Sequence, residues 1–216
     1  MIMAIDAKTP QLPTDPKIAD VAGVILAGGK SLRYGTNKAF VEVEGIPLIE
    51  RVFKVMDTLF EEVILITNTP NLYSYLDRPM FEDIYKGKGP MGGLLTALSV
   101  LFPRPGFIVA CDMPTLNADL IRHMVTAAEG FDIVVPMIGH RFEALHALYG
   151  PACLAPVKQL VSQNTLQIIR LFEHVSVRYV KEDELRRFDP QLASFFNINS
   201  PLEVERLMRT KGRQAL

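Results

Sequence analysis

Three glycines and three cationic residues follow a short apolar segment near the start of the chain. The segment Val24-Ile25-Leu26-Ala27 is rich in β-branched residues, which predicts a buried strand. Glycines let a backbone turn sharply, and successive N–H groups in such a turn form a concave site for an anion. Cations around that site suit a triphosphate, and arginine can hold phosphate oxygens with two donors. The residues concerned are Gly28, Gly29, Lys30, Arg33, Gly35 and Lys38.

Two commoner glycine motifs do not fit this segment. Gly29-Lys30-Ser31 has the ending of a P-loop, but that motif needs a glycine where the chain has Val24. The dinucleotide fingerprint GxGxxG fails because Gly28 and Gly29 are adjacent. A tight turn with surface cations is the structural alternative, but a solvated turn does not need so many glycines and cations together.

Asp112 is the acidic residue best placed to bind a metal ion. It lies in Cys111-Asp112-Met113-Pro114, directly after a predicted buried strand at residues 107–110. A triphosphate arrives as a magnesium complex, and Mg²⁺ binds one or two carboxylates together with phosphate oxygens. We therefore predict that Asp112 holds Mg²⁺. The alternative is a turn or helix-capping aspartate, although Asn117 is the better cap for the helix that follows.

Alternating strands and helices would bring these residues together. Strands are predicted at residues 21–27, 63–66, 80–84, 107–110, 132–135, 144–149, 175–180 and 195–199, with a hairpin at 39–46. Helices are predicted at residues 47–60, 94–102, 117–125, 152–162, 165–172 and from 200 to about 212. This order predicts an α/β fold with a doubly wound, mostly parallel sheet flanked by helices. Ligands in such sheets bind beyond the carboxyl ends of the strands, where Gly28, Asn68, Asp83 and Asp112 are all expected.

The length and composition favour one globular domain. The chain has 216 residues, 49% of them hydrophobic, and we expect a loose tail at residues 1–20 before a single domain at 21–216. A net charge of −1 gives no basic field for nucleic acid. Two cysteines are too few for a disulfide framework, and no apolar run approaches the roughly 18 residues that span a membrane. Without a signal peptide either, we expect a cytoplasmic protein.

The glycine segment resembles a known family signature. Leu26-Ala27-Gly28-Gly29-x-x-x-Arg33-x-Gly35-x-x-Lys38 is similar to the nucleotidyltransferase motif LAGGxSxRMGxxK, with Tyr34 in place of methionine. Within that superfamily, the chain resembles the molybdenum cofactor guanylyltransferases from about residue 22 to 207. The resemblance implies a Rossmann-like nucleotidyltransferase fold and transfer of GMP from GTP to the phosphate of molybdopterin, with release of pyrophosphate. It also implies Mg²⁺ as cofactor and transient contact with molybdoenzyme maturation partners.

The same resemblance implies a role for each site residue. Catalysis would rest on Arg33, Lys38 and Asp112, with Asp112 as the metal ligand. The acceptor would lie at Asn197 and Asn199, in a segment that resembles the family's NxNTP. The nucleotide would contact Leu26, Ala27, Gly28, Gly29, Lys38, Asn68, Asp83 and Asp112. The spacing of His140 and His146 fits no usual zinc site, so we expect no zinc.

Two alternatives to the guanylyltransferase hypothesis stay open. One is a cytidylyltransferase that acts on molybdopterin or on another small phosphate acceptor, and Ala144, where the family often has proline, leaves the acceptor less defined. The other is a non-catalytic carrier of nucleotide or pterin. The combination of Arg33, Lys38 and Asp112 argues against the carrier, because carriage alone does not need a metal at the α-phosphate.

Overall fold

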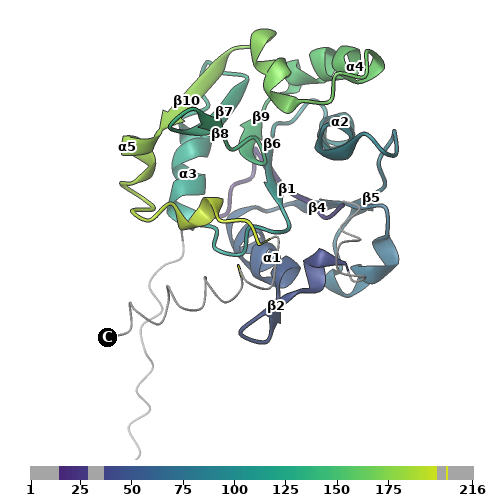
Figure 1. Ribbon diagram of the computed structural model, residues 1–216, viewed down its shortest axis with the longest axis vertical. Helices are drawn as coiled ribbons and strands as arrows, with labels where there is room; N and C mark the ends of the chain where they lie inside the picture. Colours follow the sequence, from purple (N-terminus) through teal and green to yellow (C-terminus); the bar gives the residue numbers. More distant parts are fainter. Residues whose placement is uncertain (1–14, 29–36, 199–202, 204–216) are drawn as a thin grey trace, which may run out of the picture.

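The central sheet of the protein follows the strand order β10-β7-β9-β6-β1-β4-β5, with β8 paired to β7 (Figure 1). The structure is a computed structural model that describes residues 15–28, 37–198 and 203. Its strands are β1 (Ala22–Leu26), β4 (Val63–Ile66), β5 (Met80–Phe81), β6 (Gly106–Ala110), β7 (Ile133–Ile138), β8 (Arg141–Phe142), β9 (His146–Tyr149) and β10 (Val177–Lys181).

Most neighbouring strands of this sheet run parallel. β1 pairs in parallel with β4 and β6, β4 with β5, and β7 with β10. β9 runs antiparallel between β6 and β7. Every residue of β1, β4 and β6 is buried, as expected for central strands that are covered on both faces. The predicted mostly parallel, doubly wound α/β sheet is confirmed.

Helices cover both faces of the sheet, and alternate strand residues point to opposite sides. On one face, α1 (Leu48–Leu59) and α3 (Ala118–Thr126) pack with a core that includes Ile25 and Leu65. On the other, α2 (Gly89–Leu101) and α4 (Leu154–Ser162) pack with a core that includes Val24 and Ile64. The short helix α5 (Glu182–Leu185) joins the first core through Leu185.

The predicted hairpin at residues 39–46 is present as β2 (Glu42–Val43) and β3 (Ile46–Pro47). Its turn residues have positive φ angles, 55° at Glu44 and 73° at Gly45. Two consecutive positive φ angles are typical of the turn that closes a two-residue hairpin. The hairpin leads directly into α1, which begins after Pro47.

Several predicted elements are wrong in their type or their bounds. The predicted strand at 195–199 is instead the 3-10 helix η7 (Ala193–Phe195) followed by irregular chain to residue 198, because its backbone bonds go to η7 and to Asp112. Residues 165–172 do not form an α-helix but enter the 3-10 helix η6 (Ile168–Glu173). The strand predicted at 80–84 ends at Phe81.

The ends of the chain are described only in part. Ile18, inside the expected tail, pairs with Phe60, and its N–H donates to Leu59 O at 2.8 Å. Of the predicted final helix, only Glu203 is described, and it is helical. In the described residues, no helix has the length and apolar character needed to cross a bilayer.

Candidate functional site

Four predicted site residues lie just beyond the carboxyl ends of four neighbouring strands. The last residue of β1, Leu26, pairs with the last residues of β4 and β6, Ile66 and Ala110. Ile66 also pairs with Phe81, the last residue of β5. The residues that lie two positions beyond these ends are Gly28, Asn68, Asp83 and Asp112. The sheet therefore gathers the four along one edge, as the sequence predicted.

Asp112 and Lys38 form the ion pair of the site. Lys38 Nζ donates to Asp112 Oδ2 at 2.6 Å, and the two side chains are 16% and 22% exposed. Lys38 opens the 3-10 helix η2 (Lys38–Phe40), whose first turn is capped by Asn37 Oδ1 accepting from Ala39 N. The other carboxylate oxygen, Asp112 Oδ1, is buried and has no hydrogen-bond partner in the described part of the chain. A buried anionic oxygen of this kind is suited to bind a cation.

Asn68 and Asp83 hold each other across the ends of β4 and β5. Asn68 Nδ2 donates to Asp83 Oδ2 at 2.7 Å, and Asp83 N donates to Asn68 Oδ1 at 3.1 Å. Asn68 is exposed and Asp83 is half-buried. This reciprocal pair fixes the loop after β5 while leaving Asp83 Oδ1 outside the pair.

The glycines of the site serve two different purposes. A Cβ placed on Gly28 would have no atom of the described residues within 4 Å, so none of these residues requires glycine there. The helix predicted at residues 94–102 begins earlier, because α2 already starts at Gly89 and contains Gly92 and Gly93. A Cβ on Gly93 would lie 3.3 Å from the Leu26 side chain, so Gly93 lets α2 pack against the end of β1.

The segment that carries Asn197 is attached to the loop behind Asp112. Ile198 N donates to Asp112 O at 3.0 Å, and Asn197 Oδ1 is buried with no hydrogen-bond partner among the described residues. The predicted acceptor residue Asn197 therefore lies beside the predicted metal ligand. Arg33, Gly29 and Asn199 lie outside the described residues. Leu26 is the last residue of β1, Ala27 follows it, and both are buried.

Three side-chain hydrogen bonds hold that segment in place. Thr115 Oγ1 donates to Ala193 O at 2.5 Å, and Asn117 N donates to Ser194 Oγ at 3.0 Å. Asn117 Nδ2 donates to Phe188 O at 2.9 Å, while its Oδ1 caps α3 by accepting from Leu120 N at 2.9 Å. Sequence reasoning identified only the cap, because partners more than 70 positions apart leave no local signal.

Two further ionisable side chains lie close to the site but are inert. Burial lowers the pKa of His146 to about 3, against a smaller opposite effect of Asp189, so the ring is neutral at physiological pH. Burial raises the pKa of Cys111 to about 12, and the neighbouring Asp112 carboxylate adds to the shift. A protonated thiol is a poor nucleophile, so neither group supplies reactive chemistry.

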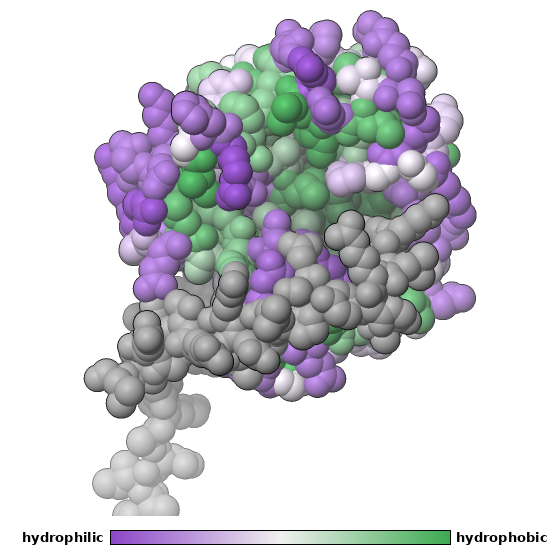
Figure 2. All heavy atoms as spheres, in the orientation of Figure 1, coloured by the Kyte–Doolittle hydropathy of each residue, from purple (hydrophilic) through white to green (hydrophobic). Residues whose placement is uncertain are grey.

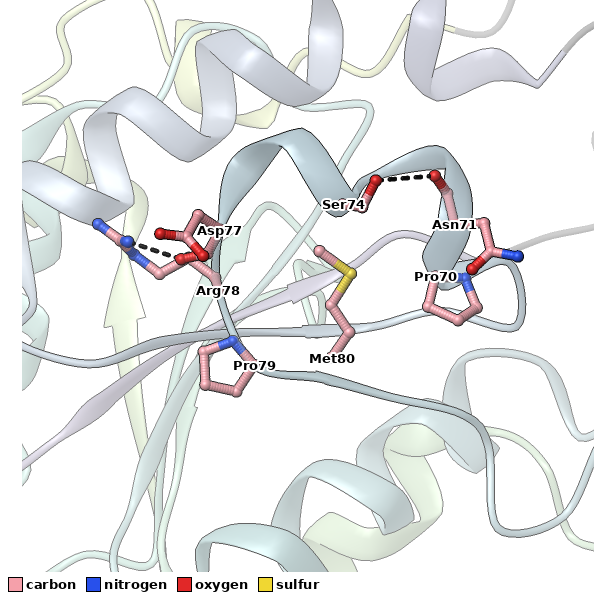
Figure 3. Close-up of a pocket in the computed structure, with 7 residues that line it drawn as sticks. All are labelled: Pro70, Asn71, Ser74, Asp77, Arg78, Pro79 and Met80. Carbon is pink, nitrogen blue, oxygen red and sulfur yellow. Dashed lines mark hydrogen bonds between the residues drawn. The ribbon is translucent and has the colours of Figure 1, made fainter.

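A hollow of about 420 Å³ lies elsewhere, beside the 3-10 helices η3 (Pro70–Leu72) and η4 (Ser74–Leu76). Figure 3 shows its lining, where Ser74 Oγ donates to Asn71 O and Arg78 donates to the backbone of Asp77. None of the predicted site residues lines it. On the face drawn in Figure 2, a recess with largely apolar walls is bordered by hydrophilic side chains.

Comparison with known proteins agrees with this geometry. Residues 23–177 match the family described as MobA-like NTP transferase domain. A probable molybdenum cofactor guanylyltransferase from Peptoclostridium acidaminophilum is 33% identical over 190 residues, covering 85% of this chain and 86% of that protein. A molybdenum cofactor guanylyltransferase from Desulfosudis oleivorans is 33% identical over 188 residues, covering 86% and 93%.

Solved structures show the same fold. Molybdopterin-guanine dinucleotide biosynthesis protein A from Archaeoglobus fulgidus superposes with a TM-score of 0.79 at 26% identity, over 89% of this chain and all of that one. The 4-diphosphocytidyl-2C-methyl-D-erythritol synthase from Anaerococcus prevotii shares the fold, with a TM-score of 0.59 at 14% identity, over 87% and 95%. Matched along most of its length by sequence and by structure, the chain belongs to the family of MobA-like NTP transferases.

Proposed function

We propose that this protein transfers GMP from GTP to the phosphate of molybdopterin and releases pyrophosphate. The observation that carries the proposal is the Lys38–Asp112 ion pair at the strand ends, next to a buried carboxylate oxygen without a partner among the described residues. The names of the similar proteins support the choice of GTP and molybdopterin. The reaction forms a bond from the molybdopterin phosphate oxygen to the α-phosphorus and breaks the bond to the leaving pyrophosphate.

We propose Mg²⁺ as the cofactor of this reaction. Asp112 Oδ1 would hold it, because it is a buried anionic oxygen that no described group uses. Within the described chain, no group of three or more His, Cys, Asp or Glu is arranged to hold a metal ion. One carboxylate suits Mg²⁺, which takes most of its remaining ligands from phosphate and water. The bound ion would stabilise negative charge that develops on the phosphate oxygens.

The residues of this chain would bind and orient the substrates. Lys38, held at Asp112, would neutralise charge on the α-phosphate and on the leaving pyrophosphate, and we propose the same role for Arg33. Gly28 lies two residues beyond the end of β1, and no atom of the described residues would meet a Cβ placed there, which suits close approach by a ligand. Gly29, Asn68 and Asp83 would complete the nucleotide side, together with Leu26 and Ala27.

The acceptor side is proposed at Asn197 and Asn199. Asn197 Oδ1 has no hydrogen-bond partner in the described ranges, which supports a polar ligand at that point, close to Asp112. Phosphoryl-type transfer depends mainly on positioning and electrostatics, so no protein nucleophile is required. We also propose that residues 21–216 act as one domain, in the cytoplasm, with transient contact to molybdoenzyme maturation partners.

The test is to incubate the protein with molybdopterin, Mg²⁺ and one nucleotide at a time, and to identify any dinucleotide product by mass. We expect the guanine dinucleotide and pyrophosphate from GTP, and little product from CTP, ATP or UTP. Product with CTP alone would make the protein a cytidylyltransferase. Tight GTP binding without pyrophosphate release would make it a carrier.

A further inference from the structure

Tyr73 is a fully buried residue that the proposed chemistry does not use. It lies between η3 and η4, and its side chain is 0% exposed. Burial raises the pKa of its hydroxyl to about 12, so the group stays protonated and able to donate at any pH used for enzyme assays. A buried hydroxyl needs a hydrogen-bond partner, so the partners of Tyr73 indicate which segments it positions.

The partners of Tyr73 are the two described ends of the glycine segment. Its hydroxyl accepts from Asn37 Nδ2 at 2.9 Å and donates to Ala27 O in a longer contact of 3.4 Å. Its ring stacks on Phe40, with centroids 5.2 Å apart and planes 19° from parallel. Ala27 directly precedes Gly28, and Asn37 directly precedes Lys38.

Each of these ends is also tied to the rest of the site. Ala27 N donates to Ile66 O at 2.9 Å, which joins it to the end of β4. Asn37 Oδ1 accepts from Ala39 N at 3.1 Å and so starts η2, from which Lys38 reaches Asp112. A change in the position of Asn37 would therefore move the ammonium group of Lys38.

We propose that Tyr73 is a positioning residue for nucleoside triphosphate binding. Its hydroxyl fixes the distance between Ala27 and Asn37, and its ring holds Phe40, so that η2 presents Lys38 to Asp112. The identity of the ligand rests on the proposed function, but the positioning effect can be measured without any ligand. In this account Tyr73 touches neither substrate nor metal.

The experiment compares Tyr73→Phe with Tyr149→Phe. Tyr149 is also 0% exposed, and its hydroxyl donates to Ala144 O at 2.6 Å, away from η2. Each variant loses one buried hydroxyl, so the loss of stability should be similar. Amide hydrogen exchange is read at residues 39–41, whose N–H groups bond to Asn37 and Lys38. The GTP dissociation constant and turnover are measured on the same samples.

We expect Tyr73→Phe to speed exchange at residues 39–41 and to weaken GTP binding, each by about tenfold, the effect of one hydrogen bond. Tyr149→Phe should leave both quantities within about twofold of wild type. The proposal would be overturned if the exchange rate and the GTP affinity of Tyr73→Phe equal those of wild type. It would also be overturned if both quantities change equally in the two variants.

A second variant keeps the test valid if Tyr73→Phe does not fold. Asn37→Ser removes the donor to Tyr73 but retains an oxygen that can cap η2. It should reproduce the faster exchange and the weaker GTP binding, and normal values of both would overturn the proposal. If wild type itself does not bind GTP, the proposed function is wrong, and the exchange result alone then decides the role of Tyr73.

Discussion

The neutral buried ring of His146 should make the protein less stable as the pH falls. His146 lies on β9, 0% exposed, with its ring edge-on to Phe107 and Phe195 at centroid distances of 5.4 and 5.0 Å. Neither ring nitrogen has a hydrogen-bond partner among the described residues. Burial lowers the pKa from 6.5 to about 3, although the nearby Asp189 carboxylate opposes the shift.

The sign and size of the effect follow from proton binding in the two states. Below pH 6.5 the unfolded chain binds a proton on this ring, whereas the folded protein does so only near pH 3. Protons therefore favour unfolding between these values, at up to about 1.4 kcal/mol per pH unit. From pH 7.5 to pH 5, the loss of unfolding free energy from this one group is about 2 kcal/mol.

His146→Leu isolates that contribution. Leucine keeps an apolar side chain between the two phenylalanine rings. It loses the ring contacts of His146, but it also removes two buried nitrogens that lack partners among the described residues. The unfolding free energy at pH 7.5 should therefore stay within about 1 kcal/mol of wild type. Urea unfolding followed by circular dichroism at pH 7.5 and pH 5 gives the pH-dependent loss for each protein. The loss should be about 2 kcal/mol smaller in His146→Leu than in wild type.

A matched control is His140→Gln, because it also removes one histidine, at an exposed position, and leaves His146 in place. It should show the same pH-dependent loss as wild type. An equal loss in wild type and His146→Leu would refute the reasoning, because it would mean that His146 binds its proton equally well in the folded and the unfolded chain.

Asp112→Asn removes the charge that pairs with Lys38, so turnover should fall by about two orders of magnitude or more while the circular dichroism spectrum is retained; near-normal turnover at saturating Mg²⁺ would contradict the metal assignment. Gly28→Val should fold with stability within about 0.5 kcal/mol of wild type, because a Cβ there meets no atom of the described residues, yet bind GTP at least about tenfold more weakly by calorimetry; unchanged affinity would remove Gly28 from the binding site. Ser194→Ala removes a buried hydroxyl and leaves the part-buried Asn117 N–H without its acceptor, which should lower the unfolding free energy by about 1–3 kcal/mol in urea; an unchanged midpoint would show that water replaces the hydroxyl.

Local patterns in the sequence determined most of the sheet and one edge of the site. The buried strands at β1, β4 and β6, the hairpin at Glu44-Gly45 and the cap at Asn117 all follow from side-chain periodicity and turn chemistry over a few residues. In a doubly wound fold, the carboxyl ends of parallel strands meet along one edge. The sequence alone therefore places Gly28 and Asp112 along the same edge.

The tertiary structure decided the contacts between residues that are distant along the chain. Three features depend on strand order and register. They are the antiparallel pairing of β9 with β6, the Lys38–Asp112 ion pair and the hydrogen bonds of Tyr73. The segment before Asn197 has the composition of a strand, but its hydrogen bonds to the loop behind Asp112 exclude it from the sheet. Periodicity specifies which side of an element is buried, whereas the partner that buries it is specified only when the whole sheet has assembled.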